Sequence, residues 1–165
     1  MNYFELYQIP ISFQPNLTEV KKQFYKLSRA YHPDFYSTET AAEKDRVLAL
    51  SAMVNKAYEV FQDPSSIIKY VLQLKGLIEE DEKYQLSPQF LMEVMDLNEL
   101  LMDASDAQEK RKISSAIQIL QSTIYEPIAT IISNYREGIT TQKELLQIKE
   151  YYYQKKYLDR ILAEY

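Results

Sequence analysis

The residues best placed to do chemistry in this chain are a histidine and an aspartate on either side of one proline, in the order His32-Pro33-Asp34. His32 is the only histidine of the sequence, which also contains no cysteine. Pro33 has no amide hydrogen and disfavours helical geometry in the residue before it, so a helix must end at this point. The tripeptide is therefore expected to form a short turn that presents an imidazole and a carboxylate side by side.

Three interpretations of this turn follow from its residues: a recognition loop for another protein, an ordinary helix stop, and a catalytic pair. Catalysis would need a nucleophile or a metal next to the pair. One histidine and no cysteine cannot make a zinc site of the usual Cys/His type. We therefore expect no catalytic residue, no metal, no cofactor and no enzymatic activity, and the choice between a recognition loop and a plain helix stop stays open at this point.

The segment before the turn, residues 17–31, has the pattern of an amphipathic helix. Its apolar residues recur at helical spacing and form one stripe: Val20, Phe24, Leu27 and Tyr31. Its basic residues lie on the opposite side: Lys21, Lys22, Lys26 and Arg29. Because this basic side leads into the turn, it favours a shared docking surface for an acidic partner. Four such charges on a chain with a net charge of −5 are a weak nucleic-acid footprint, so we expect no nucleic-acid partner.

A second helix is predicted over about residues 40–62, where Asp63-Pro64 ends it. Two antiparallel helices joined by about ten residues form a hairpin. The opening segment, residues 3–7, is short and apolar enough to lie across that hairpin.

This region resembles a J-domain, the module by which co-chaperones engage ATPase chaperones of the DnaK class. The residues that carry the resemblance are Tyr3-Phe4-Glu5-Leu6, Tyr31-His32-Pro33-Asp34, Asn55-Lys56-Ala57-Tyr58 and Asp63-Pro64. The continuation over residues 70–76 and the segment 90–100 are similar to the HscB family, the J-type co-chaperones of iron–sulfur cluster assembly. Two positions depart from the usual pattern. Phe35 stands where J-domains commonly have a basic residue. HscB-like chains often have an arginine a few residues after the Asp-Pro pair, and this chain has Ile67 in that stretch instead.

The resemblance implies two binding surfaces and two partners. His32, Pro33 and Asp34, with the four basic residues before them, would bind a DnaK/HscA-class ATPase chaperone and stimulate its ATP hydrolysis. The second surface would bind the iron–sulfur cluster scaffold protein, and it is assigned to Leu91, Met92, Met95, Asp96, Glu99 and Tyr157. The chain itself has no thiolate with which to hold such a cluster.

Charge divides the chain. Residues 1–75 carry nine Lys/Arg and eight Asp/Glu, whereas residues 76–165 carry ten and sixteen, a net charge of −6. An acidic run, Glu79-Glu80-Asp81-Glu82, follows Gly76. We therefore expect a J-domain over residues 1–76, a solvated acidic linker over 77–86 and a scaffold-binding domain over 87–165.

The C-terminal domain is predicted to be an antiparallel bundle of three helices, over about residues 88–102, 106–135 and 141 to near the C-terminus. Its long middle helix has an apolar stripe, and Pro127 should kink that helix or break its hydrogen-bond ladder. The last helix is expected to run through Leu145, Ile148, Tyr152, Tyr157 and Ile161. The expected fold is therefore all-α: a J-domain hairpin plus a three-helix bundle.

The proposed scaffold surface has an alternative explanation. Leu91, Met92 and Met95 share one side of their helix, and an amphipathic helix can equally bury that side in the bundle core. Two alternative functions also remain: a general J-domain co-chaperone that holds unfolded clients, and a structural interaction protein with a J-like hairpin in which Phe35 and Ile67 reflect lost chaperone coupling. No apolar run approaches the ~20 residues of a membrane helix, and the start lacks the features of a signal peptide, so we expect a cytoplasmic protein without a membrane partner.

Overall fold

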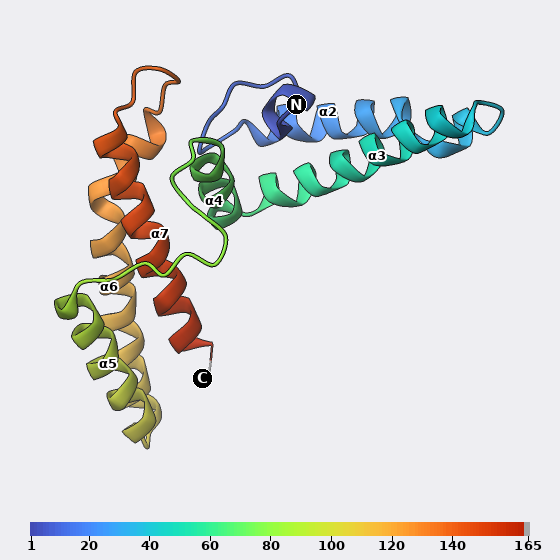
Figure 1. Cartoon of the computed structure of the whole chain (residues 1–165). Helices are drawn as coiled ribbons and strands as arrows, with labels where there is room; N and C mark the ends of the chain where they lie inside the picture. Colours follow the sequence, from blue (N-terminus) through green and yellow to red (C-terminus); the bar gives the residue numbers. More distant parts are fainter. Residues whose placement is uncertain (164–165) are drawn as a thin grey trace. The chain divides into compact units, whose positions relative to one another are not determined.

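The computed structural model describes residues 1–163, which fall into two compact units separated in the sequence between Val71 and Leu72 (Figure 1). Every regular element in this part of the chain is a helix, so the predicted all-α fold is confirmed. No helix within residues 1–163 is long and apolar enough to cross a membrane.

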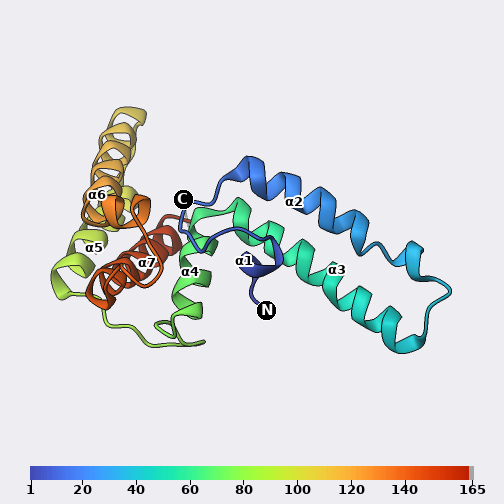
Figure 2. The ribbon, with the colours of Figure 1, turned by 90° about the horizontal axis from the view of Figure 1, so that it is seen from above.

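The first unit is built on a helical hairpin. Helices α2 (Leu17–Ala30) and α3 (Ala41–Gln62) pack side by side along their length, and the short α1 (Tyr3–Leu6) lies against α3 (Figure 2). The predicted helices at 17–31 and 40–62 are confirmed to within one residue. A further helix, α4 (Pro64–Leu74), is not among the predicted ones: Asp63-Pro64 ends α3, and Pro64 is also the first residue of α4.

Aromatic side chains of α1 and of its C-cap residue fill the core at the open end of the hairpin, opposite the α2–α3 connection. The ring of Phe4 lies 5.2 Å from that of Phe61, and the ring of Tyr7 lies 5.1 Å from it in an edge-to-face arrangement. Tyr7 is completely buried, and its hydroxyl donates a 2.7 Å hydrogen bond to the Val54 carbonyl of α3. Burial raises the pKa of this phenol well above its usual value. The N-terminal segment is therefore an integral part of the unit.

The second unit is the predicted antiparallel bundle of α5 (Pro88–Asp103), α6 (Ala107–Ser133) and α7 (Gln142–Leu162). The expected stripe of α6 is confirmed, since each of its members is buried: Ile113, Ile117, Leu120, Ile124, Ile128 and Ile131. Helix α6 continues through Pro127, which removes one hydrogen bond of the ladder without ending the helix.

The predicted last helix is confirmed as α7, but only two of the five apolar residues named for it lie in the core. Leu145 and Ile148 are buried, but the core then continues through Tyr151 and Leu158. Tyr152, Tyr157 and Ile161 are only half-buried at its margin. The buried residues of α7 are spaced by three, three and seven positions, which fits a helical period of 3.6 residues. Tyr152 and Tyr157 each lie one position away from this buried stripe, so they face the edge of the core.

The segment 77–86 differs from the expected solvated linker. Glu82 accepts 2.7 Å hydrogen bonds from the Lys149 ammonium and from the Tyr153 hydroxyl, both on α7. Tyr84 stacks on Tyr153 with ring centroids 4.6 Å apart, and Ile78 is buried. Part of this acidic segment is therefore fixed on the bundle, while the domain boundaries at 76/77 and 86/87 stay predictions.

Candidate docking surfaces

Helix α2 ends directly at the His32-Pro33-Asp34 turn. Tyr31 caps α2, and Pro33–Tyr36 form one turn of 3-10 helix, η1, for which His32 is the N-terminal cap. The Asp34 amide donates a 3.3 Å hydrogen bond to Nδ1 of His32. An accepting Nδ1 carries no proton, so the neutral ring carries its proton on Nε2. The turn thus fixes one tautomer of the imidazole.

The Asp34 carboxylate is left available. Its Oδ2 lies 3.6 Å from Nδ1 of His32, a distance that becomes an ion pair only when the ring is protonated. Its side chain is 85% exposed and accepts no hydrogen bond from any residue the structure describes. The turn therefore presents an imidazole N–H donor and a free carboxylate acceptor next to one another.

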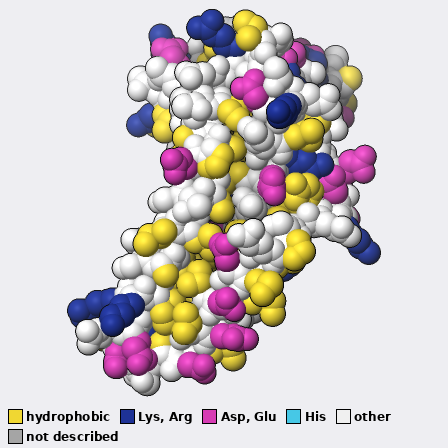
Figure 3. Space-filling view, turned by 90° about the vertical axis from the view of Figure 1, so that its left-hand side faces the viewer, with side chains coloured by type: hydrophobic (Ala, Val, Ile, Leu, Met, Phe, Trp, Pro, Cys, Tyr) yellow, Lys and Arg dark blue, Asp and Glu magenta, His cyan; other side chains and the backbone are white. Residues whose placement is uncertain are grey.

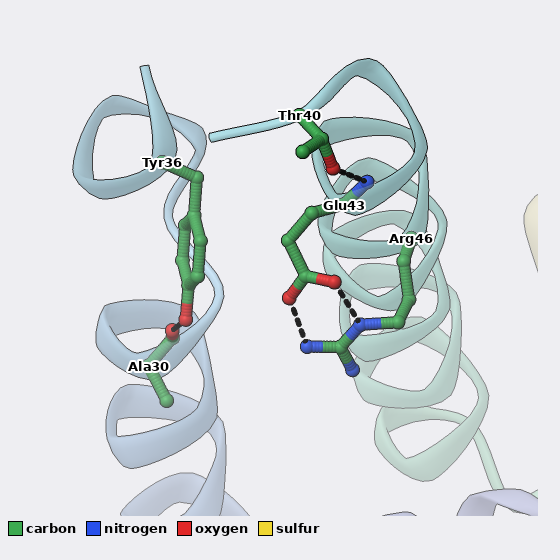
Figure 4. Close-up of polar contacts among 5 residues, drawn as sticks. All are labelled: Ala30, Tyr36, Thr40, Glu43 and Arg46. Atoms are coloured by element: carbon green, nitrogen blue, oxygen red, sulfur yellow. Dashed lines mark hydrogen bonds and ion pairs between the residues drawn. The ribbon is translucent and has the colours of Figure 1, made fainter. Parts of the chain in front are cut away.

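Contacts around the loop hold this arrangement in place (Figure 4). The Tyr36 hydroxyl donates a 2.7 Å hydrogen bond to the Ala30 carbonyl, which ties η1 back to the end of α2. Thr40 caps α3 by accepting from the Glu43 amide, and the Glu43 carboxylate accepts two hydrogen bonds from the Arg46 guanidinium. This guanidinium lowers the pKa of the Glu43 carboxyl. Both ends of the connection are thus anchored, so the tripeptide is presented by a preorganised loop.

The basic side of α2 is exposed as the sequence predicted. Lys21, Lys22, Lys26 and Arg29 are exposed, and none of them forms an ion pair within residues 1–163. With a rise of 1.5 Å per residue, the face extends about 12 Å along the helix up to the turn. Four uncompensated cations that end at an exposed carboxylate and imidazole form one continuous surface, which we call the docking face.

Two aromatic residues of the docking face were not assigned to it from the sequence. Tyr25 and Phe35 are 53% and 72% exposed. Together with Ser28, Arg29, His32 and Asp34 they line a hollow at the end of α2. Tyr25 lies four residues from both Lys21 and Arg29, a spacing that places all three on one side of a helix and could have identified it.

Helix α5 turns the predicted scaffold-binding residues away from the core. Phe90 and Val94 are the residues that α5 buries, whereas Met92 and Met95 are 63% and 54% exposed. Asp96 and Glu99 are also exposed, and Leu91 is half-buried at the edge. Figure 3 faces this side and shows hydrophobic side chains interspersed with acidic ones along the lower part of the molecule. The alternative that the methionines fill the core is therefore wrong.

The exposed side of α5 extends further than the sequence indicated. Met102 is 67% exposed and lies seven residues after Met95, on the same side of the helix; Leu100, 54% exposed, lies at its edge. Tyr157 of α7 is brought to this helix, since its ring meets that of Phe90 edge to face at 6.4 Å. We call the surface made by Met92, Met95, Asp96, Glu99 and Met102 the α5 face.

Comparison with known proteins assigns a family to each half of the chain. The DnaJ domain family model matches residues 2–70, and the model of the HSCB C-terminal oligomerisation domain matches residues 86–165. A co-chaperone protein HscB homolog of Vibrio atlanticus is 36% identical over 141 residues, which cover 84% of this chain and 81% of that protein. The chain belongs to the HscB family of co-chaperones.

HscB proteins of animals are similar over nearly the whole chain. The iron–sulfur cluster co-chaperone protein HscB of Mus musculus is 32% identical over 153 residues, 92% of this chain, but the match spans only 64% of the mouse protein's length. The crystal structure of human co-chaperone protein HscB matches 99% of this chain and 80% of that one, with a TM-score of 0.78 and 28% identity. Chaperone HscB from Vibrio cholerae gives a TM-score of 0.69 at 25% identity, over 99% of this chain and 96% of that one.

The two departures noted in the sequence have different surroundings in this HscB-family fold. Ile67 is only 4% exposed, so it belongs to the core of the first unit rather than to a contact surface. Phe35, in contrast, is exposed directly after Asp34 on the docking face. Of the two, only Phe35 lies where a partner could contact it.

Proposed function

We propose that this chain stimulates ATP hydrolysis by a DnaK/HscA-class chaperone and delivers an iron–sulfur cluster scaffold protein to it. One observation carries the proposal: the chain combines an exposed, preorganised His32-Pro33-Asp34 turn with an HscB-type bundle whose α5 face is exposed. The ATP belongs to the partner. A cytoplasmic location stays a prediction from the sequence.

The docking face supports the chaperone half of the proposal. Its four unpaired cations complement an acidic partner surface and accelerate the encounter, an effect that weakens as salt rises. His32 and Asp34 then supply one donor and one acceptor at fixed positions. Because Tyr36 and the α3 cap already hold the loop, little conformational entropy is lost when the partner binds.

The α5 face supports the scaffold half. Methionine side chains adapt their shape to a partner and offer apolar area for burial. The acidic residues at the margin, Asp96 and Glu99, add charge that selects a basic partner surface. A face of this kind binds a folded protein whose surface is apolar at the centre and basic at the rim.

The presence of both surfaces on one chain supports delivery rather than simple activation. A scaffold bound at the α5 face is tethered to the same chain that binds the chaperone. Its second encounter, with the chaperone, then occurs at an effective concentration set by the tether rather than by the free concentration. The chain would thus raise the rate of transfer without taking part in cluster chemistry.

The test is single-turnover ATP hydrolysis by the cognate chaperone, with this chain alone and with its scaffold protein. We expect stimulation by the chain and a further rise with scaffold. His32→Gln should lose the stimulation and keep scaffold binding, because it removes the imidazole and leaves the bundle intact. Stimulation by the His32→Gln variant equal to that of the wild type would refute the assignment of the turn.

A general holding function is the second candidate, since the exposed methionines of the α5 face could also bind unfolded chains. It predicts that the chain suppresses the aggregation of unrelated denatured proteins and that the scaffold adds nothing to ATPase stimulation. Normal stimulation of the chaperone would in turn exclude a purely structural interaction protein.

A further inference from the structure

A groove with a different charge from the α5 face runs along the C-terminal half of α7. One wall is the end of the 77–86 segment and the other is α7 itself. Three cations line it, Lys83, Lys156 and Arg160, together with Tyr84, Leu86 and Tyr157; the carboxylates of Glu82 and Asp159 also line it. We call it the cationic groove.

The wall formed by the 77–86 segment is fixed before any partner binds. Glu82 is held by Lys149 and Tyr153, and Tyr84 is stacked on Tyr153 with the two ring planes only 7° apart. Because the 77–86 segment is already held against α7, the groove needs no reorganisation to accept a ligand, and this favours binding.

Three cations of the groove have no carboxylate partner among the described residues: Lys83, Lys156 and Arg160. The two nearest acids are already neutralised, Glu82 by Lys149 and Asp159 by Lys155. Glu150 is a further carboxylate near the groove: burial raises the pKa of Tyr84, and the negative charge of Glu150 adds to that rise. The excess of positive charge lies in a half of the chain whose net charge is −6.

Aromatic rings support two of these cations. The Arg160 guanidinium lies 5.2 Å from the centre of the Tyr157 ring, and the Lys156 ammonium lies 6.0 Å from that of Tyr152. Contacts of this kind restrain the long side chains and leave their N–H groups free for an anion. The groove thus offers ordered positive charge next to apolar rings.

We propose that the cationic groove binds an acidic segment of the scaffold protein, an inference that rests on the proposed function. Tyr157 connects the two surfaces, because it lines the groove and also contacts Phe90 of α5. The scaffold must then carry basic residues against the α5 face, an apolar residue at Tyr157 and acidic residues in the groove. Two patches of opposite charge fix the orientation of the bound scaffold, which one patch cannot do.

The test reverses the groove charges in the full chain with Lys156→Glu and Arg160→Glu together. The matched control is Arg136→Glu with Lys143→Glu, which makes the same change in net charge on two exposed residues. Lys143 lies in the first turn of α7, about 20 Å along the helix from Lys156, and Arg136 lies in the connection before α7. Scaffold binding is measured by calorimetry at low and high salt, and ATPase stimulation is measured without scaffold.

We expect the groove variant to weaken scaffold binding about tenfold or more, with a smaller salt dependence than the wild type, while the control binds as the wild type. Equal unfolding temperatures and unchanged stimulation without scaffold show that the variant is folded. Wild-type affinity in the groove variant overturns the inference but leaves the proposed function standing, whereas a wild-type chain that does not bind scaffold overturns both. If the groove variant instead abolishes self-association in sedimentation, the occupant is a second copy of this chain and the inference is wrong.

Discussion

The exposure of the α5 methionines leads to a sharp prediction: Met92→Ala with Met95→Ala should abolish tight scaffold binding without destabilising the protein. Both side chains are more than half exposed, so truncation removes little buried area from the folded chain. Surface substitutions of this kind change the free energy of unfolding by about 0.5 kcal/mol or less each. The helix should therefore remain folded and packed.

The expected loss of affinity follows from burial in the complex. A well-buried interface side chain costs about 1–2 kcal/mol when truncated to alanine, so the pair should cost roughly 2–4 kcal/mol. At 1.4 kcal/mol per tenfold change, this corresponds to a roughly 30- to 700-fold increase in Kd. The two residues are three apart on one helix and in the same interface, so their effects need not add.

Val94→Ala is the matched control, because Val94 lies between the two methionines but is only 1% exposed. It should lower the free energy of unfolding by about 2 kcal/mol and the unfolding temperature by several degrees, with scaffold affinity at low temperature preserved. Calorimetry of the full chain with scaffold gives Kd, and circular dichroism gives the unfolding temperature. A change in Kd below threefold for the methionine pair, or a thermal loss equal to that of Val94→Ala, would refute the reasoning.

Three further changes test other parts of the structure. Phe35→Lys should leave the unfolding temperature unchanged, because this side chain is 72% exposed, and should steepen the salt dependence of chaperone binding by adding a fifth unpaired cation to the docking face. Tyr7→Phe should lower the free energy of unfolding in urea by about 1 kcal/mol, since it removes the buried 2.7 Å hydrogen bond to the Val54 carbonyl. The Lys149 ammonium, helped by a tyrosine hydroxyl, holds the pKa of the Glu82 carboxyl below its usual value. Its stabilisation is therefore complete above about pH 4.3 and is lost as the pH falls through the lowered pKa, so the difference in unfolding temperature between the wild type and Glu82→Gln should shrink over that range.

The sequence by itself determined the two helices of the hairpin, the three helices of the bundle and the docking loop. Pro33 ends α2 and the apolar spacing marks the side that faces α3, and both signals act between residues only a few positions apart. The basic side of α2 could be predicted for the same reason, because one stripe of a short helix packs on α3 and the opposite side must face water. Such local rules hold wherever the fold is carried by amphipathic helices.

Only the tertiary structure decided which side of α5 is exposed. Leu91, Met92 and Met95 are as apolar as Phe90 and Val94, so hydrophobicity alone cannot rank them. Packing of α5 against α6 and α7 buries Phe90 and Val94 in the core and leaves the methionines exposed. Whether a side of α5 is exposed depends on which side the neighbouring helices cover, so the spacing of residues within α5 cannot predict it.

The cationic groove depends on contacts that are still more distant in the sequence. Glu82 meets Lys149 and Tyr153 across 67 and 71 residues, and this contact makes a segment expected to be a solvated linker into one wall of the cationic groove. A run of acidic residues predicts only that water or a cation must lie nearby. Glu82 is paired with a cation rather than with water because the folded bundle places Lys149 of α7 beside the segment.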